Sequence, residues 1–565
     1  MGSELRDAIL NGSLLAEAAR TNNEDVQELL ADARSDYERI LSILYSKGHY
    51  GGVINILIDG REAASIPLLD SPEEIEQIVA RVLPGRVYRF GNVSAAPLAR
   101  GTELPPQFVR NELAEVGAIR DAAEASIEGW RAAGHAKADV AEQEIIARHD
   151  ARRIDARLRV APGPRLRFGS VGVRGNEDVR TRRILTIAGL EEGRVYDPDE
   201  IARAENRLRR AGSFRSVRVV EADEIVGEDL LPMTIEVVEQ TPRRFGFGAE
   251  LSSIEGGRLT GFWLHRNFLG GAERFRVDGE IAGIGGTTGG VDLDFGIRYE
   301  RPATPRSDVD LFAETGFERL NEPDFQASTA DFTLGFTRYA TDDLTVNFGV
   351  GLLYSEVRDD FGDQTYTLAT LPLGATLDRR RNALNPKDGY FVDLDMTPFY
   401  GISGTGNGMR TELDARGYES FGENERFTFA ARLQLGSLVG PELLESPPFY
   451  RFYSGGGGTV RGQDYQSLAI DLGDGDRSGG RSFFGASLEL RSGVTENIEV
   501  VTFYDYGYIG EETFPDFSGD SHAGAGLGMR YNTGIGPIRL DVATPVSGST
   551  DASDFYVYIG IGQAF

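Results

Sequence analysis

The pattern that decides the fold is clearest at residues 523–531, which read AGAGLGMRY. Apolar side chains alternate there with glycines and one arginine, so successive side chains point to opposite faces of an extended strand. The same alternation occurs at residues 245–251, FGFGAEL, and at residues 555–565, FYVYIGIGQAF. These segments predict strands with one apolar face and one face of small or polar side chains.

Alternating segments continue from residue 243 to residue 565, with breaks such as Arg301-Pro302, Asn385-Pro386 and Gly440-Pro441. About sixteen strands can be laid out, and an even number closes an antiparallel sheet without a free edge. In a soluble sandwich the polar face would point to solvent, whereas in a membrane barrel it lines the lumen. We predict a 16-stranded antiparallel transmembrane β-barrel over residues 243–565. A soluble all-β domain is the alternative.

The composition of the 565-residue chain narrows the function classes. Its net charge is −29, so no nucleic-acid partner is expected, because phosphate binding requires a basic surface. The chain has no cysteine, and it lacks the ~18 consecutive apolar residues of a membrane-spanning helix. The first residues, MGSELRDAIL, show no basic region followed by an apolar core. If the protein is exported, we expect that a signal peptide has been removed.

Before residue 243 the chain consists of small α/β repeats. The clearest unit, residues 166–242, has the order β-α-α-β-β, and Asp197 is placed to cap its second helix just before Pro198. The same order is traced over residues 88–165, with helices before Gly117 and Gly134. It is traced again over residues 1–87, with helices at residues 5–20 and 24–46 but without the opening strand. The front half is therefore predicted to be an array of three repeats.

Together, the repeats and the barrel resemble the outer-membrane assembly-factor superfamily, which includes BamA, TamA and the two-partner secretion translocators. The α/β units are similar to POTRA (polypeptide-transport-associated) domains. The resemblance covers essentially the whole chain. It implies α+β POTRA domains at residues 1–87, 88–165 and 166–242 in the periplasm, followed by a barrel at residues 243–565 in the bacterial outer membrane.

The most specific motif is GGGTVRG at residues 456–462. Val460, Arg461 and Gly462 match the tip of the sixth extracellular loop of the family, which folds back into the barrel. The family has an aromatic residue at the next position, where this chain has Gln463. The resemblance assigns the inward-folding loop to about residues 440–481.

An arginine inside a lumen requires a carboxylate partner, since an unpaired desolvated charge costs several kcal/mol. Glu489 and Asp505 lie on the inward faces of the next two predicted strands, and both match family motifs that pair with the loop arginine. Phe503 and Gly507 belong to the same strand motif as Asp505. A planar guanidinium can bridge two carboxylates. The alternative is that these are ordinary charges of the lumen wall.

The closing segment, GPIRLDVATP at residues 536–545, resembles the penultimate strand of TamA-type members in particular, and three repeats also point to TamA. The resemblance then implies a partner of the TamB type, anchored in the inner membrane. It implies insertion and folding of unfolded outer-membrane protein clients, such as autotransporters, into the lipid bilayer.

The first and last strands both contain glycines, which weaken strand pairing. We therefore predict a lateral seam between these strands, and we hypothesise that it opens so that a client strand can pair with the exposed edge. Alternatively, the glycines merely suit a crowded lumen wall. The predicted seam residues are Phe245, Gly246, Phe247, Gly248, Val557, Gly560, Gly562 and Phe565.

Enzymatic and metal chemistry are not predicted. The five histidines show no metal-ligand spacing, and no G-x-S-x-G nucleophile elbow occurs, so neither a catalytic residue nor a metal or other cofactor is expected. Asp471, Asp474 and Asp476 lack the spacing of a calcium loop and are interpreted as an acidic surface loop. Two other functions stay open: a two-partner-type secretion translocator, and a passive channel with a periplasmic docking arm.

Overall fold

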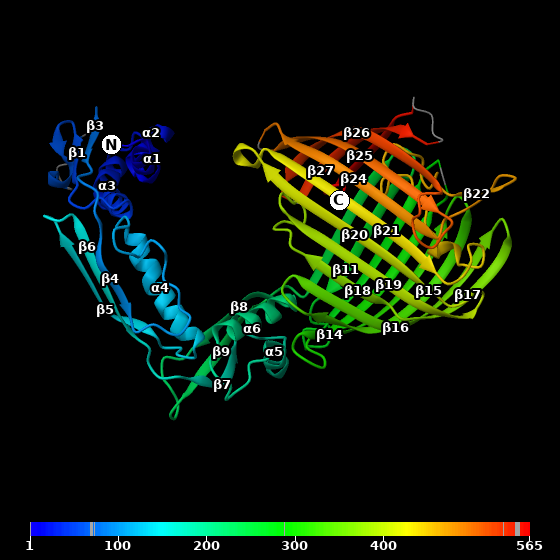
Figure 1. Ribbon diagram of the computed structural model, residues 1–565, viewed down its shortest axis with the longest axis horizontal. Helices are drawn as coiled ribbons and strands as arrows, with labels where there is room; N and C mark the ends of the chain where they lie inside the picture. Colours follow the sequence, from blue (N-terminus) through cyan, green and yellow to red (C-terminus); the bar gives the residue numbers. More distant parts are fainter. Residues whose placement is uncertain are drawn as a thin grey trace. The chain divides into compact units, whose positions relative to one another are not determined.

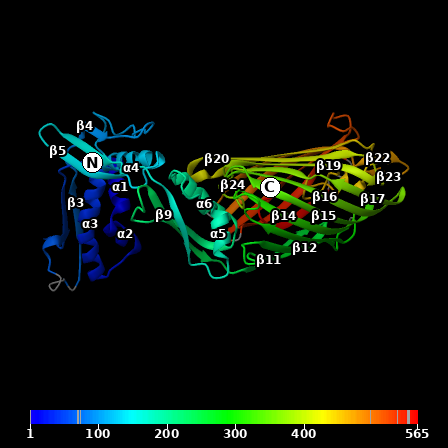
Figure 2. The ribbon, with the colours of Figure 1, turned by 90° about the horizontal axis from the view of Figure 1, so that it is seen from below.

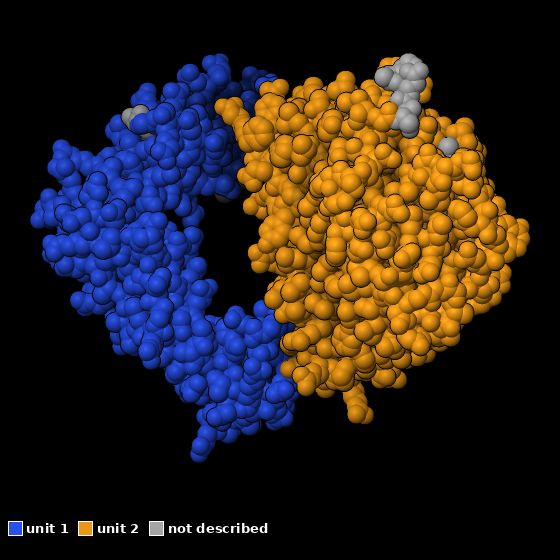
Figure 3. Space-filling model, turned by 45° about the vertical axis from the view of Figure 1, so that its right-hand side comes forward, with its two compact units in different colours: residues 1–172, 190–203, 219–234 blue, residues 173–189, 204–218, 235–565 orange. Residues whose placement is uncertain are grey.

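The computed structural model describes residues 2–67, 72, 74–287, 289–495, 497–534, 536–548 and 554–565. The chain divides into two compact units, which Figure 3 shows in different colours. The first comprises residues 1–172, 190–203 and 219–234, and the second comprises residues 173–189, 204–218 and 235–565. The division passes through the third α/β domain, and each unit is described here by itself.

The second unit contains the predicted barrel (Figure 1), and the fold class predicted from the sequence is confirmed. Within the described residues, sixteen antiparallel strands close on themselves. Strands β17 and β18 share one position, because Leu371-Pro372 interrupts the strand and proline has no N–H to donate to a neighbour. The barrel strands are β10 (Arg243–Ser252), β11 (Gly256–His265), β12 (Arg274–Ile284), β13 (Asp292–Arg301), β14 (Val309–Asn321), β15 (Phe325–Tyr339), β16 (Leu344–Asp359), β17 (Gly362–Thr370), β18 (Leu373–Asp378), β19 (Gly389–Ser403), β20 (Gly408–Phe421), β21 (Phe427–Val439), β24 (Ser482–Gly493), β25 (Ile498–Gly510), β26 (Asp520–Thr533), β27 (Gly536–Ser547) and β28 (Tyr556–Ile561).

The two faces of the barrel strands differ as the alternation predicts. Phe247 on β10 is 88% exposed and Leu527 on β26 is 61% exposed, both on the outer surface. On the inner face, Arg530 of β26 and Asp541 of β27 are fully buried. Apolar side chains on the outside and charged side chains on the inside are the arrangement that a barrel in a bilayer requires.

The first α/β domain contains three helices beside a small sheet. The helices are α1 (Ser3–Gly12), α2 (Leu14–Thr21) and α3 (Val26–Ser46); the sheet has the order β2-β1-β3, from β1 (Val53–Ile58), β2 (Arg61–Glu62) and β3 (Ile78–Leu83), and a 3-10 turn, η1 (Ala63–Ser65), follows β2. Figure 2 shows the three helices lying next to β3. The helix predicted over residues 5–20 is in fact two helices, because the Ser13 hydroxyl accepts a hydrogen bond from the amide of Ala16 and starts a new helix.

The second α/β domain has β4 (Arg89–Ala96), α4 (Val116–Ala132), β5 (Asp139–Arg148) and β6 (Arg153–Ala161), with sheet order β4-β6-β5. Two helices were predicted here, and that prediction is wrong for the segment before Gly117. Among the described residues, α4 is the only helix between β4 and β5. The preceding segment contains Pro97, Pro105 and Pro106, which lack the N–H groups that a helix interior requires.

The third α/β domain has the predicted β-α-α-β-β order. It contains β7 (Arg167–Arg174), α5 (Thr181–Ala188), α6 (Pro198–Arg210), β8 (Phe214–Glu221) and β9 (Leu230–Glu239), with sheet order β7-β9-β8. Asp197 accepts a hydrogen bond from the amide of Asp199 at 2.9 Å, as its predicted capping role requires. No helix in the described parts of the chain is long and apolar enough to cross a membrane.

Within the second unit, residues 204–210, the last part of α6, pack on the turn between β13 and β14. Arg207 donates from Nε and Nη2 to the two carboxylate oxygens of Asp308, at 2.8 Å each. Arg210 lies over the ring of Tyr339, with the guanidinium carbon 3.6 Å from the ring centroid. The hydrogen bonds from Arg207, together with its charge, hold the pKa of Asp308 below its ordinary value. A two-point ion pair therefore fixes this helix to the barrel.

We predict that Asp308→Asn loosens α6. A pKa lowered by folding means that the pair stabilises the folded state at neutral pH and ceases to do so as the pH falls below about 4, the ordinary aspartate range. Amide hydrogen exchange of residues 204–210 should accelerate about 5- to 30-fold at pH 7, as the loss of roughly 1–2 kcal/mol implies. The acceleration should shrink in acid.

The matched control is Asp343→Asn, which removes the 2.9 Å pair between Asp343 and Arg379 in exposed turns of the barrel. It should leave exchange in α6 unchanged. Equal exchange in wild type and Asp308→Asn at pH 7 would show that the Arg207 pair does not hold the helix.

Candidate functional site

The loop between β21 and β24 folds back into the barrel. It contains the 3-10 turn η3 (Pro448–Tyr450) and the hairpin of β22 (Ile470–Gly473) and β23 (Asp476–Ser478). Its tip, at Val460 to Gln463, is buried, and Arg461 is only 3% exposed. The structure thus places the motif Val460-Arg461-Gly462 in the lumen, against the inner face of the wall formed by β24 to β28.

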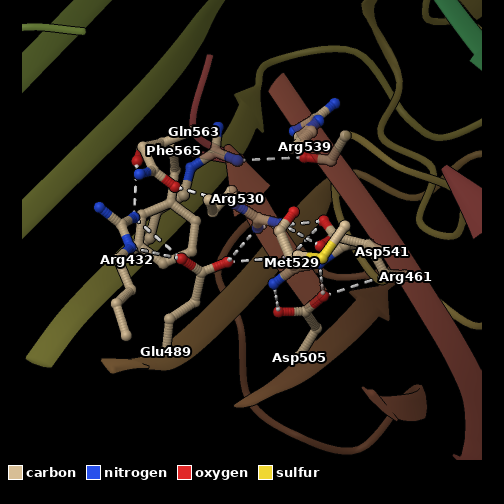
Figure 4. Close-up of polar contacts among 12 residues, drawn as sticks. Arg432, Arg461, Glu489, Asp505, Met529, Arg530, Arg539, Asp541, Gln563 and Phe565 are labelled. Carbon is tan, nitrogen blue, oxygen red and sulfur yellow. Dashed lines mark hydrogen bonds and ion pairs between the residues drawn. The ribbon is translucent and has the colours of Figure 1, made fainter. Parts of the chain in front are cut away.

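Arg461 contacts three carboxylates from three different strands (Figure 4). Its Nε and Nη2 donate to the two oxygens of Asp505 at 2.7 and 3.1 Å. Its Nη1 donates to Glu489 at 2.9 Å and to Asp541 at 3.2 Å. The guanidinium also lies over the ring of Phe503, 3.6 Å from its centroid. The two carboxylates named from the sequence are therefore brought together with the loop arginine, and Asp541 is an additional partner.

Two further arginines complete the cluster. Arg491 pairs with Glu489 at 2.8 Å, and Arg530 pairs with Asp541. The cluster thus holds three arginines and three carboxylates, all nearly or fully buried. Because taking charges out of water is costly, such a group is stable only when its charges balance and are hydrogen-bonded. The three arginines and three carboxylates give the cluster a net charge of zero.

Sequence reasoning assigned no partner to Asp541, Arg491 or Arg530. Arg530 lies in the alternating segment AGAGLGMRY and Asp541 in GPIRLDVATP, and Arg491 follows Glu489 by two residues. The alternation places these side chains on the inward faces of their strands, which could have identified them. The predicted group of one arginine and two carboxylates also left a negative charge without a partner. What the alternation cannot give is the register between strands that are far apart in the sequence.

Glycines on β25 and β26 make room for the loop tip. A Cβ atom at Gly507 would overlap the hydroxyl of Ser454, and one at Gly524 would overlap the carbonyl oxygen of Arg461. Gly524 in AGAGLGMRY therefore has a steric purpose, since the loop backbone lies directly against the strand there, whereas Gly526 and Gly528 lie against residues of the neighbouring strands.

Gln463 anchors the tip through its side-chain amide. Its Nε2 donates to the carbonyl of Ala523 at 2.7 Å and to that of Ser547 at 2.8 Å. These carbonyls belong to β26 and β27. A polar residue thus occupies the place of the family's aromatic residue by bonding to two strand backbones.

The closure between the first and last strands is short. Within the described residues, β10 and β28 share two residue pairs, Leu251 with Ile559 and Ser252 with Tyr558. By comparison, β10 shares ten pairs with β11, and β27 shares six with β28. The amide of Ser253 also donates to the carbonyl of Val557 at 3.1 Å, which places Val557 at this seam.

The other predicted seam residues lie near this closure in different ways. Phe245, Gly246, Phe247 and Gly248 lie on the part of β10 for which no β28 partner is described. Gly560 lies beside an ion pair between Arg539 of β27 and Glu250 of β10, which crosses over β28. The seam is thus held by few backbone hydrogen bonds, by the Arg539–Glu250 pair and by the Val557 amide, which donates to the Ser253 hydroxyl at 3.2 Å.

The placement of Phe565 in the seam is wrong. Strand β28 ends at Ile561, and Gly562 has φ +104°, a backbone conformation that strongly favours glycine. The chain then turns inward, so that Phe565 is 6% exposed beside Tyr418 and Ala430. The backbone oxygen of Phe565 accepts from Arg491 at 3.2 Å, and this buried donor explains why the strand does not continue.

The inward segment joins the charged cluster. Gln563 accepts from Nε of Arg530 at 3.0 Å and donates to Asn385 at 2.9 Å (Figure 4). Arg491 and Arg530 therefore each connect a carboxylate that binds Arg461 with a residue that follows the last strand. The loop tip and the end of the last strand meet in one hydrogen-bonded network.

The described residues contain no group of three histidine or acidic side chains arranged to hold a metal ion. The charged cluster neutralises the loop arginine, Arg461, and binds it to the strands beside the seam.

Comparison with known proteins gives the following likenesses. The Omp85 superfamily domain model matches residues 267–565, and a POTRA model, described as a surface antigen variable number repeat, matches residues 166–240. The outer membrane protein assembly factor BamA of Neorickettsia risticii (strain Illinois) is 22% identical over 495 residues. That alignment covers 82% of this chain and 64% of the relative, so the chain spans less than two thirds of its length.

Two solved structures share the fold. BamA from Haemophilus ducreyi lacking POTRA domains 1-3 has a TM-score of 0.65 and 15% identity, covering 84% of this chain and 100% of that one. CdiB from Acinetobacter baumannii has a TM-score of 0.54 and 11% identity, covering 84% and 89%. Both are similar to this chain in fold.

We predict that charge balance, rather than any single contact, stabilises the cluster. Asp541→Leu leaves an uncompensated buried arginine and should lower the free energy of unfolding of the barrel by about 3–5 kcal/mol. Combining it with Arg530→Met restores balance, so the double variant should lose less than Asp541→Leu alone. Urea unfolding in detergent measures both. A double variant at least as unstable as the single one would contradict the prediction.

We also predict that Gly524→Ala expels the loop tip. The added methyl group would overlap the backbone carbonyl of Arg461, which cannot rotate away as a side chain can. Cleavage of residues 440–481 by added protease should accelerate at least tenfold, by the loss of about 1.4 kcal/mol or more. The control is Gly417→Ala on β20, where a Cβ meets no atom within 4 Å. Equal cleavage in both variants would refute the steric argument.

Proposed function

Because the chain belongs to the Omp85 superfamily, we propose that it is a non-enzymatic assembly factor of the TamA type. In this proposal its barrel lies in the outer membrane, its POTRA arm lies in the periplasm, and it inserts and folds client β-barrel proteins such as autotransporters. The observation that carries the proposal is the short closure of the barrel, which in the described residues consists of two residue pairs between β10 and β28.

A short closure supports lateral opening. Residues 243–250 of β10 are paired with β11 on one side, and their other edge has no β28 partner among the described residues. The backbone N–H and C=O groups of a strand edge pair readily with another extended chain. In the proposed mechanism, a client strand adds to this edge, and further strands follow before the client leaves into the bilayer.

The charged cluster is proposed to be the latch of this seam. The segment after β28 is attached through Gln563 and Phe565 to Arg530 and Arg491. These arginines also bind the carboxylates that hold Arg461. Opening the seam therefore requires β28 to separate from β10. During this step the segment after β28 either stays bound to Arg530 and Arg491 or is released from them.

The α/β arm is proposed to dock clients and a TamB-type partner anchored in the inner membrane. Strand β5 is an edge strand of its sheet, and Ile145 and Ile146 on it are 45% and 44% exposed. An edge strand with two exposed isoleucines among polar residues suits capture of an extended chain before it reaches the barrel.

The test is a reversible lock on the seam. The chain has no native cysteine, and Leu251 lies directly opposite Ile559, so Leu251→Cys with Ile559→Cys can form a disulfide across the closure. Insertion of an unfolded barrel client into liposomes should fall to the level of protein-free liposomes on oxidation. It should return on reduction.

The matched control joins β10 to β11 with Ala249→Cys and Leu259→Cys, a directly opposed pair in the long ladder. Oxidation of this pair should not reduce insertion. Insertion that survives the seam disulfide would remove the lateral gate from the mechanism. A folded barrel that conducts ions but inserts no client in either state would favour a secretion translocator or a channel with a docking arm.

A further inference from the structure

An aromatic cluster marks the outer surface of β11 and β12 at the end where the chain enters the barrel. Trp263 and Phe275 lie on the outward faces of these strands with ring centroids 6.1 Å apart, and Phe268 of the connecting turn stacks on Phe275 at 4.6 Å. Phe268 is 43% exposed, and the next residue, Leu269, is 57% exposed. In membrane barrels such aromatic side chains gather at the level of the lipid headgroups. The cluster therefore places the β11–β12 turn at the periplasmic surface of the membrane.

Three arginines lie beside this cluster, one on β13 and two at the start of α5. Arg301 lies on the outward face of β13, two residues after Tyr299, which is paired with Phe275 of β12. The backbone amide of Arg180 and Nε of Arg183 donate to carbonyls of the β11–β12 turn at 3.0 and 3.4 Å. Strand, turn and helix thus bring the three guanidinium groups to one place on the outside of the barrel.

Positive charge exceeds negative charge at this place. Around the half-buried Arg183 lie the two other arginines and one carboxylate, Glu273. Burial lowers the pKa of Arg183, and the charges of Arg301 and Arg180 lower it further. Glu273 is 2% exposed and already accepts from the amide of Gly271 at 2.7 Å. The exposed Arg301 makes no hydrogen bond or ion pair in the described part of the chain. Three cations facing one anion stand out in a chain whose net charge is −29.

We propose that Arg180, Arg183 and Arg301 bind the headgroup phosphate of an anionic phospholipid in the periplasmic leaflet. A guanidinium presents a planar fork of donors that matches a phosphate group. The acyl chains of this lipid lie along the outward faces of β11 to β13, where Trp263 and Phe275 offer apolar surface. The bound lipid offsets the excess positive charge and holds α5 and the β11–β12 turn at the membrane surface. The site depends on the position of the barrel in a membrane and not on the assembly activity proposed above.

The test uses Trp263 as a reporter of the lipid beside it. With Trp130→Phe, Trp263 is the only tryptophan of the chain. The full chain is reconstituted in phosphatidylcholine bilayers that contain brominated phosphatidylglycerol or brominated phosphatidylcholine, since bromine quenches the fluorescence of a tryptophan that it contacts. The quenching should show a preference of about fivefold or more for phosphatidylglycerol, as arginines at a membrane surface imply. Arg301→Gln breaks no contact within the described residues and should lower this preference about threefold, whereas Arg301→Lys keeps the charge and should retain most of it.

The matched control is Arg381→Gln in the β18–β19 turn, which removes the same charge from a side chain that is 83% exposed. It should leave the preference at Trp263 unchanged. An equal loss in Arg381→Gln and Arg301→Gln would show a diffuse attraction between the lipid and the net charge of the protein, and would overturn the site. Equal quenching by the two brominated lipids in the folded wild-type barrel would overturn it as well.

A second arm separates a lipid headgroup from free phosphate. Amide hydrogen exchange of α5 should slow in bilayers that contain phosphatidylglycerol, because the lipid joins the helix to the barrel surface. Inorganic phosphate added to phosphatidylcholine bilayers should have little effect, since it has no acyl chains to hold it at the outer face of the barrel. Equal protection by inorganic phosphate would assign the three arginines to a soluble phosphate ligand and would overturn the lipid assignment.

Discussion

Much of the barrel's interior depends on the neutralisation of one buried cation, the guanidinium of Arg461. A charge at 3% exposure is stable only if the surrounding carboxylates and hydrogen bonds replace its lost hydration. Those carboxylates come from β24, β25 and β27, so they converge only when these strands hold their observed register. A slip of one residue would turn Asp505 to the lipid side. The loop position, the strand register and the need for glycine at residue 524 are therefore linked to a single electrostatic requirement.

The barrel combines a tightly determined interior with a loosely closed edge. Around Arg461, each carboxylate has at least one arginine partner, and the guanidinium is also stacked on Phe503. At the seam, the two described residue pairs between β10 and β28, the bridge from Arg539 to Glu250 and the contacts of Ser253 with Val557 join the start of the barrel to its last two strands. Such a contrast is informative because ladders elsewhere in the barrel are long. Of the glycines named for the seam, Gly246 and Gly248 lie on the part of β10 without a described β28 partner, and Gly560 lies beside the Arg539–Glu250 pair.

The sequence predicted the strands of the barrel well but only part of the charged cluster, for physical reasons. Period-two alternation is a local property, so strand positions and the inward faces of Glu489 and Asp505 follow from it directly. Asp541 and Arg530 have the same inward parity, but the pairing of Asp541 with both Arg461 and Arg530 depends on register and tilt across the barrel. Phe565 was misplaced because alternation continues through residue 565, whereas Gly562 and the buried donor Arg491 redirect the chain. The prediction of a helix before α4 failed because it rested on the spacing of apolar residues and did not take account of three prolines in that segment.

The hydrogen bonds of the cluster are arranged so that withdrawal of the loop tip and release of the segment after β28 are separate motions. Asp505 holds Arg461 through three hydrogen bonds, from its backbone amide, Nε and Nη2. Withdrawal of the loop breaks these bonds but leaves Arg491 on Glu489 and Arg530 on Asp541. The segment after β28 binds those two remaining arginines, so it stays in place when the loop tip leaves. Loss of Arg461 takes away the partner of the buried Asp505, so withdrawal of the tip carries the cost of an uncompensated charge. That cost holds the tip in place, while the hydrogen bonds of Arg491 and Arg530 to the segment after β28 do not depend on it.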